Sequence, residues 1–360
     1  MSAGYRDFVP AGTAERIRML RAMDSAVAGL RAHQNKLDVI GNNIANVNTF
    51  GYKSQSFSFQ EAMYQSAASS TGGVRGQAVG SNGSQFGYGT LMGSISMDMT
   101  ASTPTQVGGL NACLNADGFF ITSSMANKDV NLGGTAADNT SNIKGSDFEY
   151  TRVGKFQLDS QGYLTDGTNF VYGFRPSDTA ASGFDTESMV ALRVPSAATL
   201  TITAAVPPAT VDTETLALTF DHDNEALLSS SIQINNLGEV TVTVPVTITD
   251  NTVTPAETRT ENRQVSIGKV AVATFQNQEG LMKAGGTYYT ASSGDNSGAC
   301  SATVPGGSTA SLMSGYLEAS NVDLAREFSE MITTQRGFQA NSKIITVSDE
   351  ILSDLVNMKR

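Results

Sequence analysis

The chain has 360 residues, of which 40% are hydrophobic and only 16% are charged, and its formal net charge is −11. An acidic chain is a poor match for nucleic-acid phosphates, so we exclude a nucleic-acid-binding protein. Two cysteines, Cys113 and Cys300, are too few for a disulfide framework or a cysteine-based metal site, although a single bridge between them stays open. No apolar run reaches the length of about 18 residues that suggests a membrane span, and no signal-peptide pattern is visible.

Residues 1–18 show no usable periodicity, and we interpret them as an N-terminal extension that leaves either Met1 or Met19 as the start. A helix is predicted over about residues 20–46, because apolar or small residues recur there at alternating steps of three and four. Asparagine and glycine after residue 45 are expected to end it. The apolar residues of this N-terminal seam are Leu20, Met23, Val27, Leu30, Leu37 and Ile44.

The middle of the chain predicts mainly β-structure. Residues 54–90 are rich in Ser, Gly and Gln and are interpreted as an extended linker that becomes ordered on assembly. From about residue 91 to 315, short runs of β-branched and aromatic residues alternate with turn signals. We expect strands at 199–203, 240–244 and 269–275, and a hairpin around 159–162. The predicted division is an inner β-domain (91–175 plus 231–315) and an inserted outer β-domain (176–230).

A second helix is predicted after Ser320-Asn321-Val322-Asp323, which fits the Ser-x-x-Asp form of a capping box. Lys359 and Arg360 are expected to close it, because cations stabilise a helix C-terminus. Neither helix can bury its seam alone, so both chain ends are expected to pair with each other and with copies of themselves; an intramolecular helical hairpin is the alternative. The C-terminal seam residues are Leu324, Phe328, Met331, Phe338, Ile345, Leu352 and Val356.

The expected fold class is therefore multidomain α+β. A terminal α-helical coiled-coil domain is formed by both chain ends, residues 19–53 plus 316–360, and two mainly-β domains lie between them.

The residues after the first helix resemble the N-terminal signature of bacterial flagellar rod and hook proteins, NNxANxxTxGYK. Further matches lie at 115–121, 150–164, 317–325 and 335–343, and the ending 355–360 is similar to hook proteins proper. No match covers 176–265. The signature residues are Asn42, Asn43, Asn46, Thr49, Gly51, Tyr52 and Lys53.

The resemblance implies a subunit of the flagellar hook, which polymerises into a flexible curved tube outside the cell and transmits torque from rod to filament. Its implied partners are copies of itself, rod, hook-cap and hook–filament junction proteins, and the flagellar export apparatus. Export would proceed without a cleaved signal peptide. A distal rod protein of the same family is the first alternative. That alternative predicts a stiffening insertion near residues 54–90 and no outer domain.

A secreted β-rich adhesin or carbohydrate-binding module is a weaker alternative, since the chain lacks tryptophan. No pattern supports an enzyme: catalytic, cofactor-binding and metal-ligating sets are all missing from the sequence. His33 and His222 are lone histidines in polar surroundings, and we expect both to be solvated.

Overall fold

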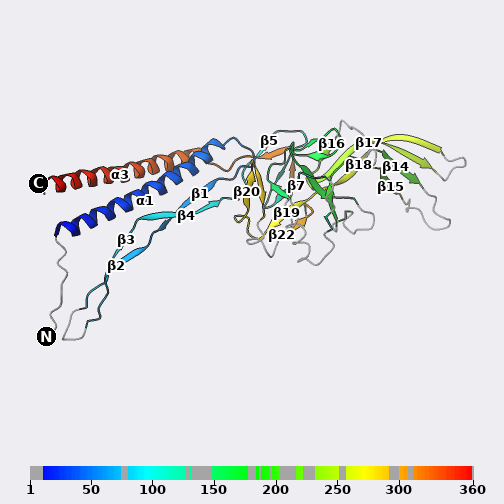
Figure 1. Ribbon diagram of the computed structural model, residues 1–360. Coiled ribbons are helices and arrows are strands. Elements are labelled where there is room, and N and C mark those ends of the chain that lie inside the picture. Colours follow the sequence, from blue (N-terminus) through cyan, green and yellow to red (C-terminus); the bar gives the residue numbers. More distant parts are fainter. Residues whose placement is uncertain are drawn as a thin grey trace. The chain divides into compact units, whose positions relative to one another are not determined.

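The computed structural model describes residues 11–73, 80–126, 130–131, 148–176, 184–185, 188–194, 197–202, 216–221, 232–250, 257–291, 300–306 and 311–358 (Figure 1). The chain divides into two compact units. The helical unit comprises Met1–Val47, Lys53–Asp98 and Val322–Arg360, and the β unit comprises Asn48–Tyr52 and Met99–Asn321. The predicted domain boundaries differ from this division into two units. The division of the middle of the chain into two domains stays a prediction.

In the helical unit, two long helices lie side by side: α1 (Ala11–Ala45) and α3 (Leu324–Asn357). The start of α1 at Ala11 corrects the predicted start near residue 20. Residues 11–19 lack an apolar stripe but contain Ala, Glu, Arg and Met, which favour helix without one. The helix ends at Ala45, where the asparagine-rich segment begins, as predicted.

The predicted extended linker at 54–90 overlaps two antiparallel strand pairs within the described residues. β1 (Gln55–Glu61) pairs with β4 (Thr90–Met97), and β2 (Tyr64–Ala68) pairs with β3 (Ser84–Gly87). Serine hydroxyls bond across the first pair, at 2.8 Å between Ser56 and Ser96 and 3.0 Å between Ser58 and Ser94. A serine-rich composition is therefore compatible with a ladder here, because cross-strand hydroxyl pairs stabilise a sheet.

The start of α3 also differs from the predicted capping box. Asp323 is the N-cap itself, and its Oδ1 accepts hydrogen bonds from the backbone N–H groups of Ala325 at 2.9 Å and Arg326 at 3.4 Å. An aspartate in this position satisfies donors that no helical carbonyl can reach. The predicted C-terminal closure by Lys359 and Arg360 lies outside the described residues.

The β unit is built on a 16-stranded sheet within the described residues. Its main path runs β15 (Leu216–Asp221), β14 (Ala197–Ile202), β17 (Glu239–Asp250), β18 (Glu257–Val270), β12 (Phe170–Phe174), β7 (Phe119–Ser123), β9 (Glu149–Thr151), β21 (Tyr288–Thr290) and β20 (Met282–Gly285). Off this path lie β8 (Val130–Asn131), β10 (Gln157–Leu158), β11 (Leu164–Thr165), β13 (Ser188–Ala191), β16 (Ile232–Ile234), β19 (Val272–Phe275) and β22 (Cys300–Thr303). Two small sheets pair β5 (Pro104–Gln106) with β24 (Tyr316–Glu318), and β6 (Ala112–Leu114) with β23 (Leu312–Ser314).

The predicted strands at 199–203 and 240–244 correspond to β14 and β17, and the hairpin around 159–162 is confirmed by the antiparallel pairing of β10 with β11. The run 269–275 is divided at Ala271 into the end of β18 and β19. The described strands of 176–230, β13 to β15, join this same sheet. An independent outer domain therefore stays a prediction, because much of that range lies outside the described residues.

The core of the β unit lies around β7, whose five residues are all buried. This strand pairs with β9, β12 and β19, so both of its faces and both of its edges are covered. Such a strand reads as a continuous apolar run rather than an alternating one, which is the pattern of Phe119-Phe120-Ile121. The core continues through residues such as Leu164, Val171, Val240, Val270 and Val272.

Candidate functional site: the contact between the terminal helices

The facing sides of α1 and α3 carry small and polar residues. A Cβ added to Gly29 would lie 2.6 Å from Nδ2 of Asn341, and one added to Gly337 would lie 2.7 Å from Cε1 of His33. Both glycines therefore permit an approach that a side chain would block. Since the partner's number falls as the α1 number rises, the helices are antiparallel. Other buried residues of the two helices are Ala26, Ala32, Val39, Ile40, Thr334 and Ser348.

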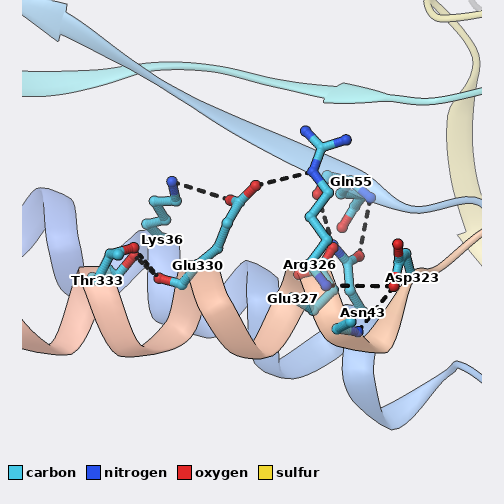
Figure 2. A network of polar contacts seen from close by, with 10 residues as sticks. Lys36, Asn43, Gln55, Asp323, Arg326, Glu327, Glu330 and Thr333 are labelled. Atoms are coloured by element: carbon cyan, nitrogen blue, oxygen red, sulfur yellow. Dashed lines mark hydrogen bonds and ion pairs between the residues drawn. The ribbon is translucent and has the colours of Figure 1, made fainter.

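A charged group extends this contact along the helices (Figure 2). Nζ of Lys36 lies 3.3 Å from Oε2 of Glu330, and Nε of Arg326 lies 3.2 Å from its Oε1. Burial, the largest single effect, would raise the pKa of Glu330, but the hydrogen bonds and charges of Lys36 and Arg326 together outweigh it and lower that pKa. The side chains stay partly exposed, so each ion pair is worth at most about 1 kcal/mol.

Asn43 joins three elements at the end of this contact (Figure 2). Its Nδ2 donates to the carbonyl of Gln55 in β1 at 2.8 Å and to Oε1 of Glu327 in α3 at 3.1 Å. Its Oδ1 accepts the N–H of Gln55 at 3.0 Å. Asn43 is 1% exposed, and both N–H donors and the oxygen of its side chain form hydrogen bonds. Of the common side chains, only an amide offers this combination of donors and acceptor. Burial raises the pKa of Glu327, and the hydrogen bond from Asn43 opposes that rise.

Asn42 and Asn46 shape the last turn of α1. Nδ2 of Asn46 donates to the carbonyl oxygen and to Oδ1 of Asn42, both at 2.9 Å. Such local side-chain bonds stabilise a helix end by satisfying groups that lack a helical partner.

The exposed seam residues, such as Val27, Phe328 and Phe338, are not covered by this contact, and the seam as a polymerisation surface stays a prediction. Three seam residues of α1 lie one position after a residue of the contact: Val27 after Ala26, Leu30 after Gly29, and Leu37 after Lys36. One position is a rotation of about 100°. Leu20, Val27, Leu324, Phe328, Phe338 and Val356 are exposed, and Met23, Leu30, Leu37, Ile44, Met331, Ile345 and Leu352 are half-buried.

Apolar periodicity does not identify these contact residues, because all of them except Ile40 are small or polar. They have a periodicity of their own. Positions 26, 29, 33, 36, 40 and 43 alternate steps of three and four, as do 327, 330, 334, 337 and 341. A second stripe of small and polar residues beside an apolar one could have identified the helix contact.

A buried charge cluster in the β unit contains residues from three of the matched segments. Arg152 is fully buried, with Nη1 3.5 Å from both carboxylate oxygens of Glu318 and Nη2 3.7 Å from Oδ1 of Asp117. Its guanidinium carbon lies 5.3 Å from the ring centroid of Phe119. Glu318 is itself 1% exposed, so each buried charge depends on the other.

The signature residues Gly51 and Tyr52 lie beside this cluster. The N–H of Gly51 donates to the carbonyl of Glu318 at 2.8 Å. With a φ of 69° and Val153 Cγ2 2.6 Å from a Cβ built there, this position requires glycine. Tyr52 is buried, and Nζ of Lys283 lies 4.6 Å from the centroid of its ring. The backbone N–H of Tyr52 donates to the carbonyl of Thr49 at 3.3 Å.

Lys53, the last signature residue, is fully buried in the helical unit. Cys113 is buried and forms no disulfide, and its Sγ donates to the carbonyl of Leu114 at 3.5 Å. Within the described ranges, no cluster of His, Cys, Asp and Glu could hold a metal ion. No helix in the same ranges is long and apolar enough to cross a membrane.

Comparisons with known proteins agree on one family. A family model described as "Flagellar basal body rod FlgEFG protein C-terminal" matches residues 313–358, and one described as "Flagella basal body rod protein" matches residues 23–53. The flagellar basal-body rod protein FlgG of Bacillus subtilis is 34% identical over 347 residues, covering 95% of this chain and 100% of that protein.

Hook proteins match over a similar share of the chain. The flagellar hook protein FlgE of Borreliella burgdorferi is 28% identical, with 95% of this chain and all of that protein covered. FlgE of Salmonella typhimurium is 26% identical, and the alignment covers 94% of this chain and 100% of that protein. A crystal structure of hook protein FlgE2 from Helicobacter pylori aligns with 61% of this chain at 10% identity, with a TM-score of 0.32 that supports no argument about fold.

Asn43→Ala should destabilise the helical unit. The change leaves the N–H and C=O of Gln55 and the carboxylate of Glu327 without this partner, and a polar group that loses its partner costs up to about 1–3 kcal/mol when it is buried. We expect the free energy of unfolding, followed by the helical circular dichroism signal in urea, to fall by at least about 2 kcal/mol. Asn35→Ala is the control, because Asn35 is exposed and its amide contacts the sulfur of Met92 at 3.9 Å. Equal losses in the two variants would contradict the role of Asn43.

Arg152→Met should destabilise the β unit by about 3–5 kcal/mol, because the buried carboxylate of Glu318 would lose the cation that faces it. Adding Glu318→Gln should recover part of the loss, since the remaining buried group is then neutral. Asp117→Asn is the control, because that side chain is 73% exposed. Thermal unfolding of these three variants and of the wild type measures this. A double variant no more stable than Arg152→Met would show that the charges are not coupled.

Proposed function

The chain belongs to the family of flagellar rod and hook proteins, and we propose that it polymerises with itself as a subunit of the flagellar hook. Membership of this family makes it a structural component of the flagellum. The finer proposal rests on the seam residues, which are apolar, regularly spaced and left outside the contact between α1 and α3. A soluble chain rarely leaves such a stripe uncovered.

The two seams support one continuous apolar face. In each helix, part of the seam lies one position after a residue of the helix contact: Leu30 after Gly29 in α1, and Phe338 after Gly337 in α3. A step of one residue rotates the side-chain direction by about 100° around a helix. When two antiparallel helices face each other, the residue that follows each contact residue therefore points toward the same side of the pair. The seams of α1 and of the first half of α3 therefore form one apolar face on one side of the helix pair. We propose that a second copy of the chain covers this face.

The helix contact prepares this face for polymerisation. The contact between α1 and α3 is made mostly by polar and small residues, so most apolar seam residues are not needed to hold the two helices together. A polymer then gains the burial of the seam residues, at about 25 cal/mol per Å² of apolar surface removed from water. The low charge of the chain suits contacts between outer surfaces that must shift as a curved tube turns, because few strong ion pairs would have to break. Export without a cleaved signal peptide is part of this proposal.

A distal rod subunit is the second candidate. FlgG of Bacillus subtilis, a rod protein, shares 34% identity with this chain, and strands β1 to β4 occupy the region where a stiffening insertion is expected in a rod protein. The hook proposal is favoured by β13 to β15, which fall in the segment that a rod protein is expected to lack.

Immunogold labelling of purified hook–basal bodies separates the two candidates. The epitope tag belongs in residues 251–256, after the end of β17 at Asp250 and before the start of β18 at Glu257. The hook proposal predicts gold along the curved tube, and deletion of the gene should leave complete rods without hooks. Gold confined to the distal rod would favour the second candidate.

Phe328→Asp should abolish polymerisation without unfolding the chain. Phe328 is 50% exposed in the single chain, so a charge there stays solvated until a second copy covers it. We expect the critical concentration, measured by sedimentation, to rise more than about tenfold, since burying an unpaired charge costs well over 1.4 kcal/mol.

Ser329→Asp is the matched control. It places the same charge one position further on, at an exposed residue that lies outside the seam. Polymerisation of Phe328→Asp at the wild-type concentration would refute the proposed face. Equal loss in both variants would show that charge on α3, rather than the position of the seam, controls assembly.

A further inference from the structure

His33 occupies an unusual position in the helical unit, which corrects the expectation that it is solvated. Its ring lies against Gly337 of α3 and makes an edge contact with Phe59 of β1, with ring centroids 5.3 Å apart. The Nδ1 atom is buried and has no hydrogen-bond partner among the described residues. One imidazole therefore contacts all three elements while one of its two nitrogens is left unsatisfied.

The charges around the ring oppose its protonation. Lys36 lies one turn further along α1, and its Nζ is 5.9 Å from the centroid of Phe59. The facing carboxylate of α3, Glu330, is already bound by Lys36 and Arg326. β1 has Glu61 as its only charged residue, at the strand end, and β4 has none. Burial, followed by the charge of Lys36, lowers the pKa of His33.

We propose that His33 is a pH-sensitive latch that holds α3 and β1 against α1 only while its imidazole is neutral. A proton on Nδ1 would create a buried donor with no acceptor, beside a lysine. Such a group is costly to keep in place, so the imidazolium moves to water and the contacts with Gly337 and Phe59 are lost. The inference concerns contacts within one chain and does not depend on polymerisation.

A pocket beside the ring offers a route for this release. It has a volume of about 400 Å³ and is lined by Ser25, Gly29, His33, Phe59, Thr90 and Asn341, among others. Its hydroxyl and amide groups can hold water next to the imidazole. The charged form could therefore be hydrated at the margin of the contact without complete unfolding of the helices.

The direction of the pH effect follows from the lowered pKa. Above the ordinary value of 6.5, His33 is neutral in both the closed and the released state, and the latch is fully effective. As the pH falls through 6.5, the released state takes up a proton first, and the closed state is weakened until the pH reaches its lower pKa. One proton limits the effect to about tenfold per pH unit.

Hydrogen exchange measured by mass spectrometry on the full chain tests the latch, with rates corrected for the intrinsic effect of pH. Between roughly pH 7.5 and 5.5, wild-type peptides covering 26–40, 55–61 and 330–341 should lose protection, by no more than about tenfold per unit. His33→Phe and His33→Asn cannot take up this proton and should keep the same protection at both pH values. His222→Gln is the control, since these are the only two histidines in the chain, and it should behave as wild type.

Three results would overturn the latch. The first is wild-type protection that does not change with pH. The second is a loss of protection in the two His33 variants equal to that of wild type. The third is a loss of the pH response in His222→Gln. If a phenylalanine side chain does not fit at position 33, the smaller His33→Asn variant still tests whether the pH response requires His33. Carboxylates such as Glu327 remain in every variant, so their titration would appear equally in all of them.

Discussion

The close approach of α1 and α3 is the constraint on which the helical unit depends. Gly29 and Gly337 give the space for it, and the pairs formed by Asn43 with Glu327 and Lys36 with Glu330 allow one register. Because the residues of this contact are mostly small or polar, apolar residues such as Val27, Phe328 and Phe338 stay exposed in the single chain. Polar pairs of this kind contribute more to a unique register than to stability, which is our hypothesis for their role here. The exposed face is then available for a second copy.

The β unit fixes the chain segments that lead out of the helices by a different interaction. Residues 48–52 and Glu318 enter it at the Arg152 cluster, where a guanidinium, two carboxylates and an aromatic ring meet. Gly51 bonds to the backbone of Glu318, and Arg152 bonds to its side chain, so the two segments are held at one residue. This explains why segments far apart in the sequence carry the resemblance: they come together in space.

Much of the fold could be predicted from the sequence. Helix periodicity, the asparagine-rich helix end and β-branched runs identified both helices, the β-rich middle and the family. Apolar periodicity alone could not predict the helix contact, because it does not distinguish a face buried within the chain from one that another copy would cover. The start of α1 lacked a stripe to follow, and the strands of 55–97 depend on serine pairs across the ladder. The partly buried His33 looked like a surface histidine, since its packing comes from two distant segments.

The most direct test of this account is an electron cryo-microscopy map of the assembled polymer at side-chain resolution. The account predicts that Gly29 contacts Asn341, and Gly337 contacts His33, within each subunit. It also predicts that Leu30, Phe328 and Phe338 contact neighbouring subunits. A map in which Leu30 and Phe338 pack against each other within one subunit, with Gly29 and Gly337 turned toward neighbours, would contradict it.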